Sequence, residues 1–476
     1  MLGTLFTMNP LLDVDPSAKE RFTRELGIEL GVPQQIQSLI EQCLSEDASE
    51  RPAPHQIVEV IKQAPTLSCI SARTPLSQSE IHQILPKITS YIRASADVQR
   101  KDRLFPGDFL GFLTNSLSIA YGATGVAYAL SKIDGEVPQL IQSWLLEQPV
   151  NQADYAPGLY IGSAGISWAF WELGFHTISL QIMRSIDNHP LLWDVADVFY
   201  GAAGYGLACL HLYLETKGQE WLDRAVEVGE WLLVSKKEDE KRGFYWPDKE
   251  GRTHLGYTRG ASGIALYLLY LSLMTSEQQF LETGQRALAF DLSFLERTRD
   301  GILSLPRGVV GSFENVISHY WLNGSTGVAT ALLRYWAYTK NPHDLALLEE
   351  LAPDTFRKYT VHPSLFQGLS GLGNFLLDAY DFTSDKGYLD RAYEAAKSVL
   401  LYQVQRPEGV AFPGDQLLRI STDFGTGSAG IALFLHRLAY ADQRIGNFNF
   451  TLDRLLWDRS GQDNLIPVSR GQEKYM

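Results

Sequence analysis

The chain has 476 residues, of which 45% are hydrophobic and 20% are charged, as is ordinary for a folded globular protein. Lys and Arg number 41 and Asp and Glu number 55, so the formal net charge is −14. This acidic balance argues against a general nucleic-acid binder and against a membrane-surface protein. The three cysteines, Cys43, Cys69 and Cys209, are far apart and odd in number, so they provide neither a disulfide framework nor a CxxC metal motif.

The N-terminal stretch carries no basic start and no small-residue cleavage site, so it does not read as a signal peptide. The longest apolar run, residues 263–274, is too short to span a bilayer. We therefore expect a cytoplasmic protein without a membrane span.

Residues 1–75 are interpreted as a separate segment, because they lack the glycine repeat found in the rest of the chain. They contain a spaced pattern that ends in Arg-Pro, formed by Leu39, Ile40, Cys43, Leu44, Asp47, Arg51 and Pro52. This pattern resembles the last helices of a protein kinase C-lobe; an amphipathic helical pair with a proline stop is the alternative. No Gly-rich loop, catalytic lysine or HRD motif precedes it, so we expect no phosphoryl transfer by this chain. The chain then reads as the C-terminal part of a longer protein.

A repeat of Gly-x-x-Gly, followed each time by an apolar run, organises residues 76–476 into one domain. It occurs seven times, with its two glycines at 122 and 125, 162 and 165, 201 and 204, 260 and 263, 324 and 327, 368 and 371, and 427 and 430. Three copies carry an aromatic-Leu-acid triplet that starts 20 residues after the first glycine, at Trp221, Phe280 and Tyr388. The fixed offset indicates one repeated structural unit.

Each unit reads as two helices. The helix after the glycines is nearly all apolar, which predicts burial on most sides, and the helix that follows has a single apolar stripe of 3.6-residue period. Seven buried inner helices with seven amphipathic outer helices predict an all-α fold, a closed α/α toroid, with an open solenoid as the alternative. The glycines are interpreted as a packing device for the tight turn into each inner helix. If the seven helix N-termini meet around a central cavity, their partial positive charge favours anions there.

The glycine ladder resembles the LanC-like lanthionine cyclases. The motifs that carry this resemblance are LYIGSAG at 159–165, DVFYG at 197–201 and DFGTGSAG at 423–430. The likeness covers roughly residues 110–440, and with the kinase-like tail before it the chain looks like the C-terminal cyclase domain of a class III lanthionine synthetase.

The resemblance implies a function. Such a toroid takes a ribosomally made precursor peptide and adds its cysteine thiols to dehydroalanine or dehydrobutyrine, forming lanthionine or, in some class III members, labionin. The further partner it implies is the kinase and lyase portion of the same synthetase, missing from this chain. In zinc-dependent relatives a Cys precedes the fifth-repeat glycine and a Cys-His pair the sixth. Here these places hold Leu322 with Asn323, and Phe366 with Gln367, so we predict no catalytic zinc and no other cofactor.

Two further positions carry over from the family. Its aspartate before the third-repeat glycine is matched by Asp197, and its histidine before the fourth is replaced by Arg259. Because an arginine stays protonated, the hypothesis makes Arg259 an electrostatic clamp on thiolate or enolate and Asp197 its orienting group or a general base. Asp197 as a simple helix cap is the alternative. The predicted substrate-binding residues are Tyr200, Tyr257, Tyr320, Asn323, Gln367 and Asp423.

Two other functions remain open at this point. A toroid without zinc and without the histidine is compatible with a non-catalytic module that binds or scaffolds the precursor peptide. A glycoside-active toroid enzyme would need paired carboxylates, for which Asp194 and Asp197 are one helical turn apart. His319 is a possible acid or base without motif support.

Overall fold

The structure is a computed structural model that describes residues 34–43, 45, 47–63, 76–309 and 316–457. In its N-terminal part, helices α3 (Gln34–Cys43) and α4 (Pro54–Gln63) pack against each other, with a short 3-10 turn, η1 (Ala48–Glu50), between them. Arg51 follows that turn and donates from Nε to the carbonyl of Ser45 at 2.9 Å. The predicted helical pair is therefore present, while its likeness to a kinase tail stays a prediction. Leu44, Cys69 and the proposed boundary at residue 75 lie outside the described residues.

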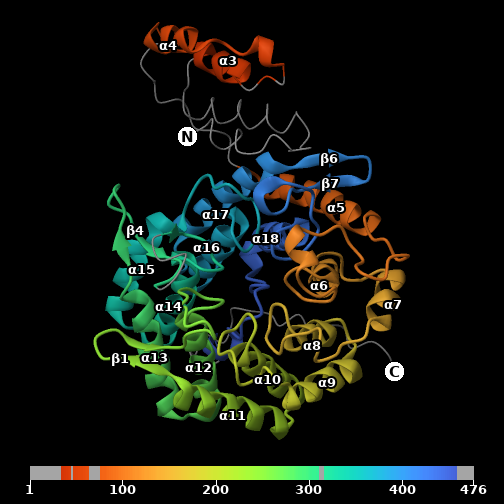
Figure 1. The fold of residues 1–476 in the computed structure, drawn as a ribbon, viewed down its shortest axis with the longest axis vertical. Helices are drawn as coiled ribbons and strands as arrows, with labels where there is room; N and C mark the ends of the chain where they lie inside the picture. The colour runs from red at the N-terminus through yellow and green to blue at the C-terminus, as the bar shows by residue number, and fades with distance from the viewer. Residues whose placement is uncertain (1–33, 44, 46, 64–75, 310–315, 458–476) are drawn as a thin grey trace.

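Seven inner helices begin where the glycines predict. In every copy the first glycine is the N-cap residue and the helix starts at the next residue. The helices are α6 (Ala123–Asp134), α8 (Ser163–Glu172), α10 (Ala202–Thr216), α12 (Ala261–Thr275), α14 (Ser325–Thr339), α16 (Leu369–Thr383) and α18 (Ser428–Ala439). Each packs against the next, and α18 packs against α6, so the inner ring is closed (Figure 1). The closed toroid is confirmed over the open solenoid.

Seven outer helices surround this ring. Six of them follow their inner partner in the chain, as predicted: α7 (Gln139–Glu147), α9 (His176–Ser185), α11 (Gln219–Ser235), α13 (Gln278–Leu292), α15 (Pro342–Thr355) and α17 (Lys386–Val399). The partner of α18 is α5 (Gln78–Ala94), which comes before the whole repeat in the chain. The first and last parts of the toroid are thus joined by helix packing.

The loops that precede the inner helices, here called the glycine loops, are joined in a ring of backbone hydrogen bonds. The residue two positions before each first glycine donates its N–H to the carbonyl of the equivalent residue in the next loop. The bonds run from Ala120 to Tyr160 (2.8 Å), Tyr160 to Phe199 (3.3 Å), Phe199 to Thr258 (3.0 Å), Thr258 to Leu322 (3.1 Å), Leu322 to Phe366 (3.0 Å), Phe366 to Gly425 (2.9 Å) and Gly425 back to Ala120 (2.8 Å). Sequence positions that repeat along the chain therefore become equivalent positions around one circle.

The second glycine of each pair is required by close packing. A Cβ at Gly165 would lie 1.6 Å from the carbonyl oxygen of Leu159, and one at Gly327 would lie 2.3 Å from that of Trp321. Any side chain here would push the glycine loop away from the helix it precedes. The glycines therefore hold each loop against its own helix, which keeps the seven loops in their ring.

Aspartates on outer helices fix two of these loops. Asp291 of α13 accepts hydrogen bonds through Oδ2 from the N–H of Gly256 (3.1 Å) and from the N–H (2.9 Å) and hydroxyl (2.6 Å) of Ser262. Asp354 of α15 accepts from the hydroxyl of Ser325 in the same way. These serines lie inside the Gly-x-x-Gly motif, so the outer layer determines where an inner helix begins.

Aromatic side chains from several loops meet at the middle of the ring and fill the place where the glycine repeat predicts a central cavity. We call this cluster the aromatic plug; it consists of Tyr160, Phe199, Tyr257, Trp321, Phe366, Phe424 and Phe450. Within it, the ring centroids of Tyr160 and Phe366 are 5.5 Å apart and those of Trp321 and Phe366 are 5.8 Å apart. Six of these residues come from six different glycine loops and Phe450 comes from the segment after α18, so the plug packs the repeats against one another.

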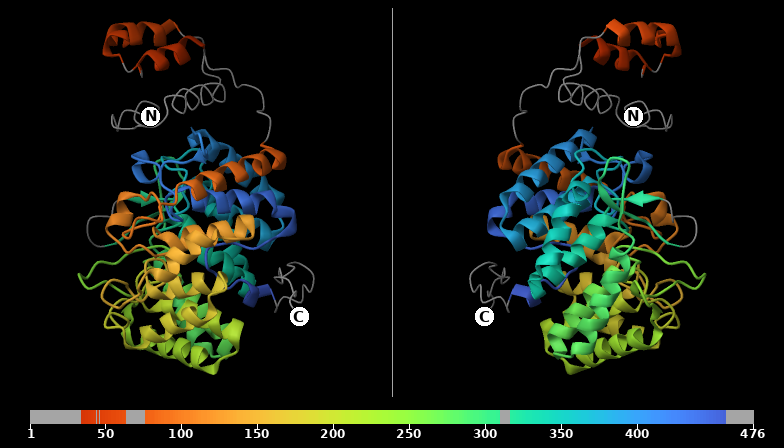
Figure 2. Two further views of the ribbon diagram at one scale, coloured as in Figure 1. Left: turned by 90° about the vertical axis from the view of Figure 1, so that its right-hand side faces the viewer. Right: turned by 90° about the vertical axis from the view of Figure 1, so that its left-hand side faces the viewer.

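Strands are few and short in the described residues. They form the hairpin β1 (Lys237–Asp239) with β2 (Gly243–Tyr245), the antiparallel set β3 (Glu296–Arg297), β4 (Leu303–Pro306) and β5 (Ile317–Ser318), and the hairpin β6 (Val404–Arg406) with β7 (Gly409–Ala411). The glycine loops gather at one end of the toroid, and the last described segment, which includes α19 (Arg454–Trp457), lies at the other (Figure 2). None of the helices described is long and apolar enough to cross a membrane.

Candidate functional site

Asp197 and Arg259, from two neighbouring glycine loops, form an ion pair. Nε of Arg259 lies 3.6 Å from Oδ2 of Asp197, and the guanidinium lies over the ring of Tyr200 at 5.3 Å. The hydrogen-bond ring brings these loops together, because Phe199 donates to Thr258, the residue before Arg259. The structure therefore unites three of the predicted site residues at the glycine-loop end.

The carboxylate of Asp197 is buried and can exchange a proton near neutral pH. Its Oδ1 accepts the backbone N–H of Tyr200 at 2.7 Å, while only 6% of the residue is exposed. Burial raises its pKa to about 6, although the charge of Arg259 and the hydrogen bond from Tyr200 oppose that rise. A carboxylate with such a pKa can both accept and return a proton under physiological conditions.

A second carboxylate, Asp248, which the sequence reasoning did not identify, also faces Arg259. Its Oδ2 lies 3.7 Å from Nη2 of Arg259, 2.8 Å from Nε of Arg252 and 3.1 Å from Nε2 of His254. Although burial works in the opposite direction, hydrogen bonds from Arg252 and His254 lower the pKa of Asp248 to about 2. Asp248 therefore stays ionised, and Arg259 is shared between two carboxylates.

A further cation, Arg307, lies at the same end of the toroid. Its Nη2 donates to Oε1 of Gln367 at 3.0 Å, and Gln367 directly precedes the first glycine of the sixth repeat. Arg307 follows β4, and its carbonyl accepts the N–H of Leu255 at 3.1 Å, so it borders the loop that carries Arg259. No motif in the sequence indicated this arginine.

Several polar side-chain atoms at the glycine-loop end are buried without a hydrogen-bond partner. They include Nε of Arg259, Nε of Arg307, Oδ1 of Asn323, Nε2 of His319 and Nδ1 of His362. Tyr320 is half-buried against His319, with ring centroids 4.3 Å apart, and Nε2 of His362 lies 3.7 Å from Oδ1 of Asp415. Buried polar groups without partners are uncommon in folded proteins and need an explanation.

Two predicted substrate-binding residues do not line an open surface. Tyr257 is fully buried in the aromatic plug, with its ring 4.8 Å from that of Trp321. Asp423 is 2% exposed, and its carboxylate accepts from the N–H of Thr426 at 2.6 Å and from the hydroxyls of Thr426 and Ser421. Neither side chain is free to contact a peptide in this conformation.

The positions that hold zinc ligands in part of the family do not fit a metal ion here. Leu322 and Phe366 have no donor atom, Phe366 packs inside the aromatic plug, and Gln367 is bonded to Arg307. The described residues contain no group of three His, Cys, Asp or Glu side chains that could hold a metal. No chemical step through zinc can be derived from these residues.

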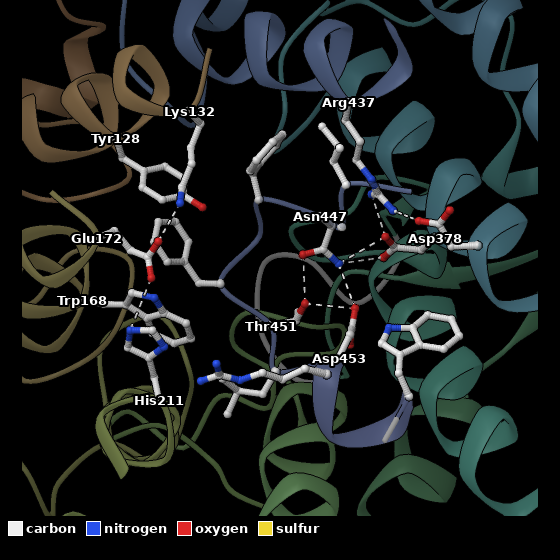
Figure 3. A pocket seen from close by; sticks show the side chains of 18 of the residues that line it. Tyr128, Lys132, Trp168, Glu172, His211, Asp378, Arg437, Asn447, Thr451 and Asp453 are labelled. Atoms are coloured by element: carbon white, nitrogen blue, oxygen red, sulfur yellow. Dashed lines mark hydrogen bonds and ion pairs between the residues drawn. The ribbon is translucent and has the colours of Figure 1, made fainter. Parts of the chain in front are cut away.

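The opposite end of the toroid contains a cavity of about 270 Å³ lined by the C-terminal halves of inner helices (Figure 3). One wall carries Trp168, Glu172 and His211, with the rings of Trp168 and His211 stacked 4.1 Å apart. The other side is formed by Asp378 and by the segment that contains Asp453. None of the predicted site residues lies here, and the charged groups are mostly paired with one another.

Comparison with known proteins gives one family and two informative relatives. The family model described as lanthionine synthetase C-like protein matches residues 118–451. A protein of Streptomyces coelicolor described as a probable SapB synthase is 30% identical over 348 residues, which are 72% of this chain and 36% of that protein. The chain thus spans about a third of that relative's length. Among solved structures, nisin cyclase superposes with a TM-score of 0.54 at 16% identity, covering 80% of this chain and 96% of its own. At that identity the likeness concerns the fold alone.

Proposed function

Because the chain belongs to the lanthionine synthetase C-like family, we propose that it is the zinc-independent cyclase domain of a class III lanthipeptide synthetase. Its substrate is a precursor peptide that contains cysteine and dehydroalanine or dehydrobutyrine, and its product is lanthionine or labionin. The kinase and lyase steps that create the dehydrated residues belong to other parts of the same synthetase. The observation that carries the proposal is the Asp197–Arg259 pair at the glycine-loop end, with a buried carboxylate whose pKa is about 6.

The reaction needs a proton acceptor and later a proton donor. The cysteine thiol loses its proton, and the thiolate sulfur forms a bond to the β-carbon of the dehydroamino acid. The electron pair of the alkene moves to the α-carbon and its carbonyl as an enolate, which is then protonated at the α-carbon. One proton leaves and one returns, so the addition needs no oxidant, reductant or leaving group.

Asp197 is suited to carry that proton. As a carboxylate it accepts the proton of the thiol, and as a buried acid it returns the proton to the α-carbon. Its backbone bond with Tyr200 and its ion pair with Arg259 fix its orientation. Because Arg259 faces both Asp197 and Asp248, we assign it to positioning Asp197 in place of the clamp expected from the sequence.

The experiment counts free thiols by mass spectrometry after alkylation. The chain is incubated with a dehydrated, cysteine-containing precursor peptide, with and without a chelator. Loss of thiols above the uncatalysed rate, unchanged by the chelator, is the expected result. Loss that the chelator abolishes would contradict zinc independence, and a rate equal to that without protein would favour a scaffold module. Hydrolysis of the products followed by amino-acid analysis separates lanthionine from labionin.

Asp194→Asn is the matched control for Asp197→Asn. Asp194 lies three residues earlier in the same loop, but it is exposed and pairs with Lys249 at 2.7 Å. We expect only the Asp197 variant to lose cyclisation. Equal loss in both variants would instead fit a mechanism based on a carboxylate pair.

A further inference from the structure

We infer that Arg307 is the group that binds the cysteine thiolate of the substrate. Its guanidinium supplies the positive charge for which the described residues offer no metal-binding cluster. The inference rests on the proposed function. It makes Arg307 a catalytic residue, and it divides the work between two arginines, of which Arg259 positions the proton carrier and Arg307 holds the nucleophile.

The first support is charge balance. Arg259 lies between Asp197 and Asp248, at 3.6 and 3.7 Å, so two carboxylates compete with any anionic ligand for its charge. Arg307 forms no ion pair with any carboxylate of the described residues, and its one side-chain hydrogen bond goes to the neutral amide of Gln367. Its charge is therefore available to an incoming anion.

The second support is the surrounding polar atoms. Nε of Arg307 is buried and makes no hydrogen bond, and no carboxylate of the described residues pairs with it. Nε of Arg259 also makes no hydrogen bond, but it faces the carboxylate of Asp197 at 3.6 Å. An N–H that is shielded from water and unpaired loses free energy unless a ligand accepts from it. A thiolate in this position would accept from Nε and compensate the guanidinium charge in one contact.

The third support is that the titratable groups near Arg307 neither neutralise its guanidinium charge nor add a second positive charge. Burial lowers the pKa of His319 to about 4. The charges of Arg357 and Arg307 lower this pKa further, and the charge of Asp354 raises it. Burial and Arg307 likewise lower the pKa of His362, against the nearby Asp415. Both histidines are therefore neutral at pH 7 and add no competing cation. Asp354, which accepts from Ser325 and Arg357, is already satisfied.

The fourth support is rigidity. The N–H of Arg307 donates to the carbonyl of Val316 at 2.9 Å, and its carbonyl accepts from Leu255 at 3.1 Å. The next residue, Gly308, forms a β-bridge with His254. Arg307 is thus fixed against the loop that contains Asp248 and Arg259, so the thiolate and the proton carrier Asp197 would be held at one end of the toroid.

The chemistry follows from charge. An unperturbed cysteine has a pKa near 8.5, so only a few per cent is thiolate at pH 7. A guanidinium in direct contact favours the charged form and lowers the pKa of the bound thiol. The proton released goes to Asp197 and returns to the α-carbon, so the step stays balanced.

The test compares Arg307→Gln, Arg307→Lys and the parent chain, with Arg286→Gln as the matched control. Arg286 is exposed on α13 and pairs with Glu238 at 2.7 Å, so its loss should change nothing at the site. Two quantities are measured across pH: the cyclisation rate with dehydrated peptide, and the thiolate ultraviolet absorbance of a bound cysteine peptide that has not been dehydrated. A thermal melt of each variant checks folding.

In the parent complex we expect the thiolate to form at lower pH than in free peptide. In Arg307→Gln the pH midpoint of thiolate formation should return to that of the free peptide. Cyclisation should slow by about 10- to 100-fold at pH 7, and the difference in rate from the parent should shrink at high pH. Arg307→Lys, which keeps the charge, should lie between the two. A deficit that is the same at every pH would overturn the inference and assign Arg307 to the enolate. An unchanged cyclisation rate in Arg307→Gln would also overturn the inference, because Arg307 would then have no part in the reaction.

The two hypotheses fail in different ways. If the parent lowers the pH of thiolate formation but does not cyclise, the anion site stands and the proposed function falls. If the parent cyclises and the absorbance transition does not depend on Arg307, the proposed function stands and this inference falls. Should Arg307→Gln fail to fold, the charge-conserving Lys variant still decides between these outcomes.

Discussion

Asp197 and Asp423 occupy equivalent positions in two glycine loops, and their carboxylates make the same turn. Each lies four residues before the first glycine and accepts through Oδ1 the N–H of the residue three positions on, at 2.7 Å for Asp197 and 2.6 Å for Asp423. Their second oxygens differ, because that of Asp423 accepts two hydroxyls of its own loop and that of Asp197 faces Arg259. The repeat thus supplies a structural turn, and one copy has an oxygen available for chemistry.

The pair predicts opposite effects of the same substitution. Asp197→Asn keeps the turn but cannot carry a proton, so we expect cyclisation to fall by about 100-fold or more with folding intact. Asp423→Asn should lower the melting temperature while the rate per folded molecule stays within a few-fold of the parent. Both quantities are measured on the same preparations, by thiol counting and by calorimetry. A catalytic loss in Asp423→Asn as large as that in Asp197→Asn would show that Asp423 acts on the substrate.

The pKa of Asp197 predicts how the rate depends on pH. Since the ionised carboxylate must accept the thiol proton, kcat/KM should rise as pH increases through about 6. A second rise at higher pH reports ionisation of the substrate thiol. The acid limb should disappear in Asp197→Asn, leaving a low rate that follows the thiol alone. An acid limb that persists in this variant would assign it to another group.

Stability should respond to the same group in the opposite direction. The pKa of Asp197 is about 6 in the folded state, while its ordinary value of 3.8 applies to the unfolded chain. Between pH 3.8 and about pH 6 the unfolded chain therefore binds fewer protons than the folded chain. Stability present below pH 3.8 is therefore lost as pH rises to about 6, by at most about 3 kcal/mol. Asp291, whose pKa is raised by burial to about 7, adds a similar decline in stability, and this decline is the same in the parent and in Asp197→Asn.

The comparison of Asp197→Asn with the parent removes the contribution of Asp291. Urea unfolding at pH 4, 5, 6 and 7 should show the variant gaining stability relative to the parent up to pH 6 and no further. A difference independent of pH would mean that Asp197 is ionised throughout this range.

The glycines determined how much of the fold could be predicted. Gly122 and its six equivalents mark helix starts because each second glycine lies against the loop before it, a local constraint that leaves a trace in sequence. That α5 pairs with α18 left no such trace, since the two are more than 300 residues apart and meet only by closing the ring. Likewise the aromatic plug, which buries Tyr257, depends on the packing of several repeats.

The candidate site was predicted in part for the same reason. Asp197 and Arg259 stand at fixed offsets from glycines, so their positions at one end of the toroid follow from the repeat. Asp248 and Arg307 lie in the longer connections outside the repeat, and only backbone bonds such as that from Leu255 to Arg307 bring them near the site. Site residues that lie in insertions between repeats have no fixed spacing from the glycines, so the repeat pattern does not predict them.

The second glycines should tolerate no side chain. Gly327→Ala places a Cβ 2.3 Å from the carbonyl oxygen of Trp321, so the fifth glycine loop must move, which breaks the hydrogen-bond ring at Leu322. We expect a loss of about 2 kcal/mol or more in the free energy of unfolding. Gly387→Ala is the control, because its Cβ would meet only side-chain atoms of Asp385, at 3.2 Å or more. That variant should be neutral or slightly stabilised, and equal losses in both would show that loop packing is not the cause.

A buried ion network closes the other end of the toroid and predicts the last effect. Arg334 on α14 is fully buried and contacts Asp378 at 2.8 Å and Asp453 at 2.6 Å, and Asp453 also accepts from the hydroxyl of Tyr270 at 2.6 Å. Figure 3 shows the two aspartates of this network. Asp453 belongs to the segment that ends in α19, so the network ties that segment to the inner helices. Removing Arg334 would leave Asp453 without its cation, whereas Asp378 would keep its ion pair with Arg437 at 2.7 Å.

We therefore expect Arg334→Met to lower the free energy of unfolding by about 3–5 kcal/mol and to make the segment around Asp453 sensitive to limited proteolysis. Arg297→Gln, which breaks an exposed pair with Glu350, should cost less than about 1 kcal/mol. The double variant Arg334→Met with Asp453→Leu should recover part of the loss, since a paired replacement by apolar groups leaves one fewer buried charge. Cleavage sites and melting curves check all three proteins. If the double variant were less stable than Arg334→Met alone, Asp453 would be stabilised by Tyr270 and its other neighbours without the arginine.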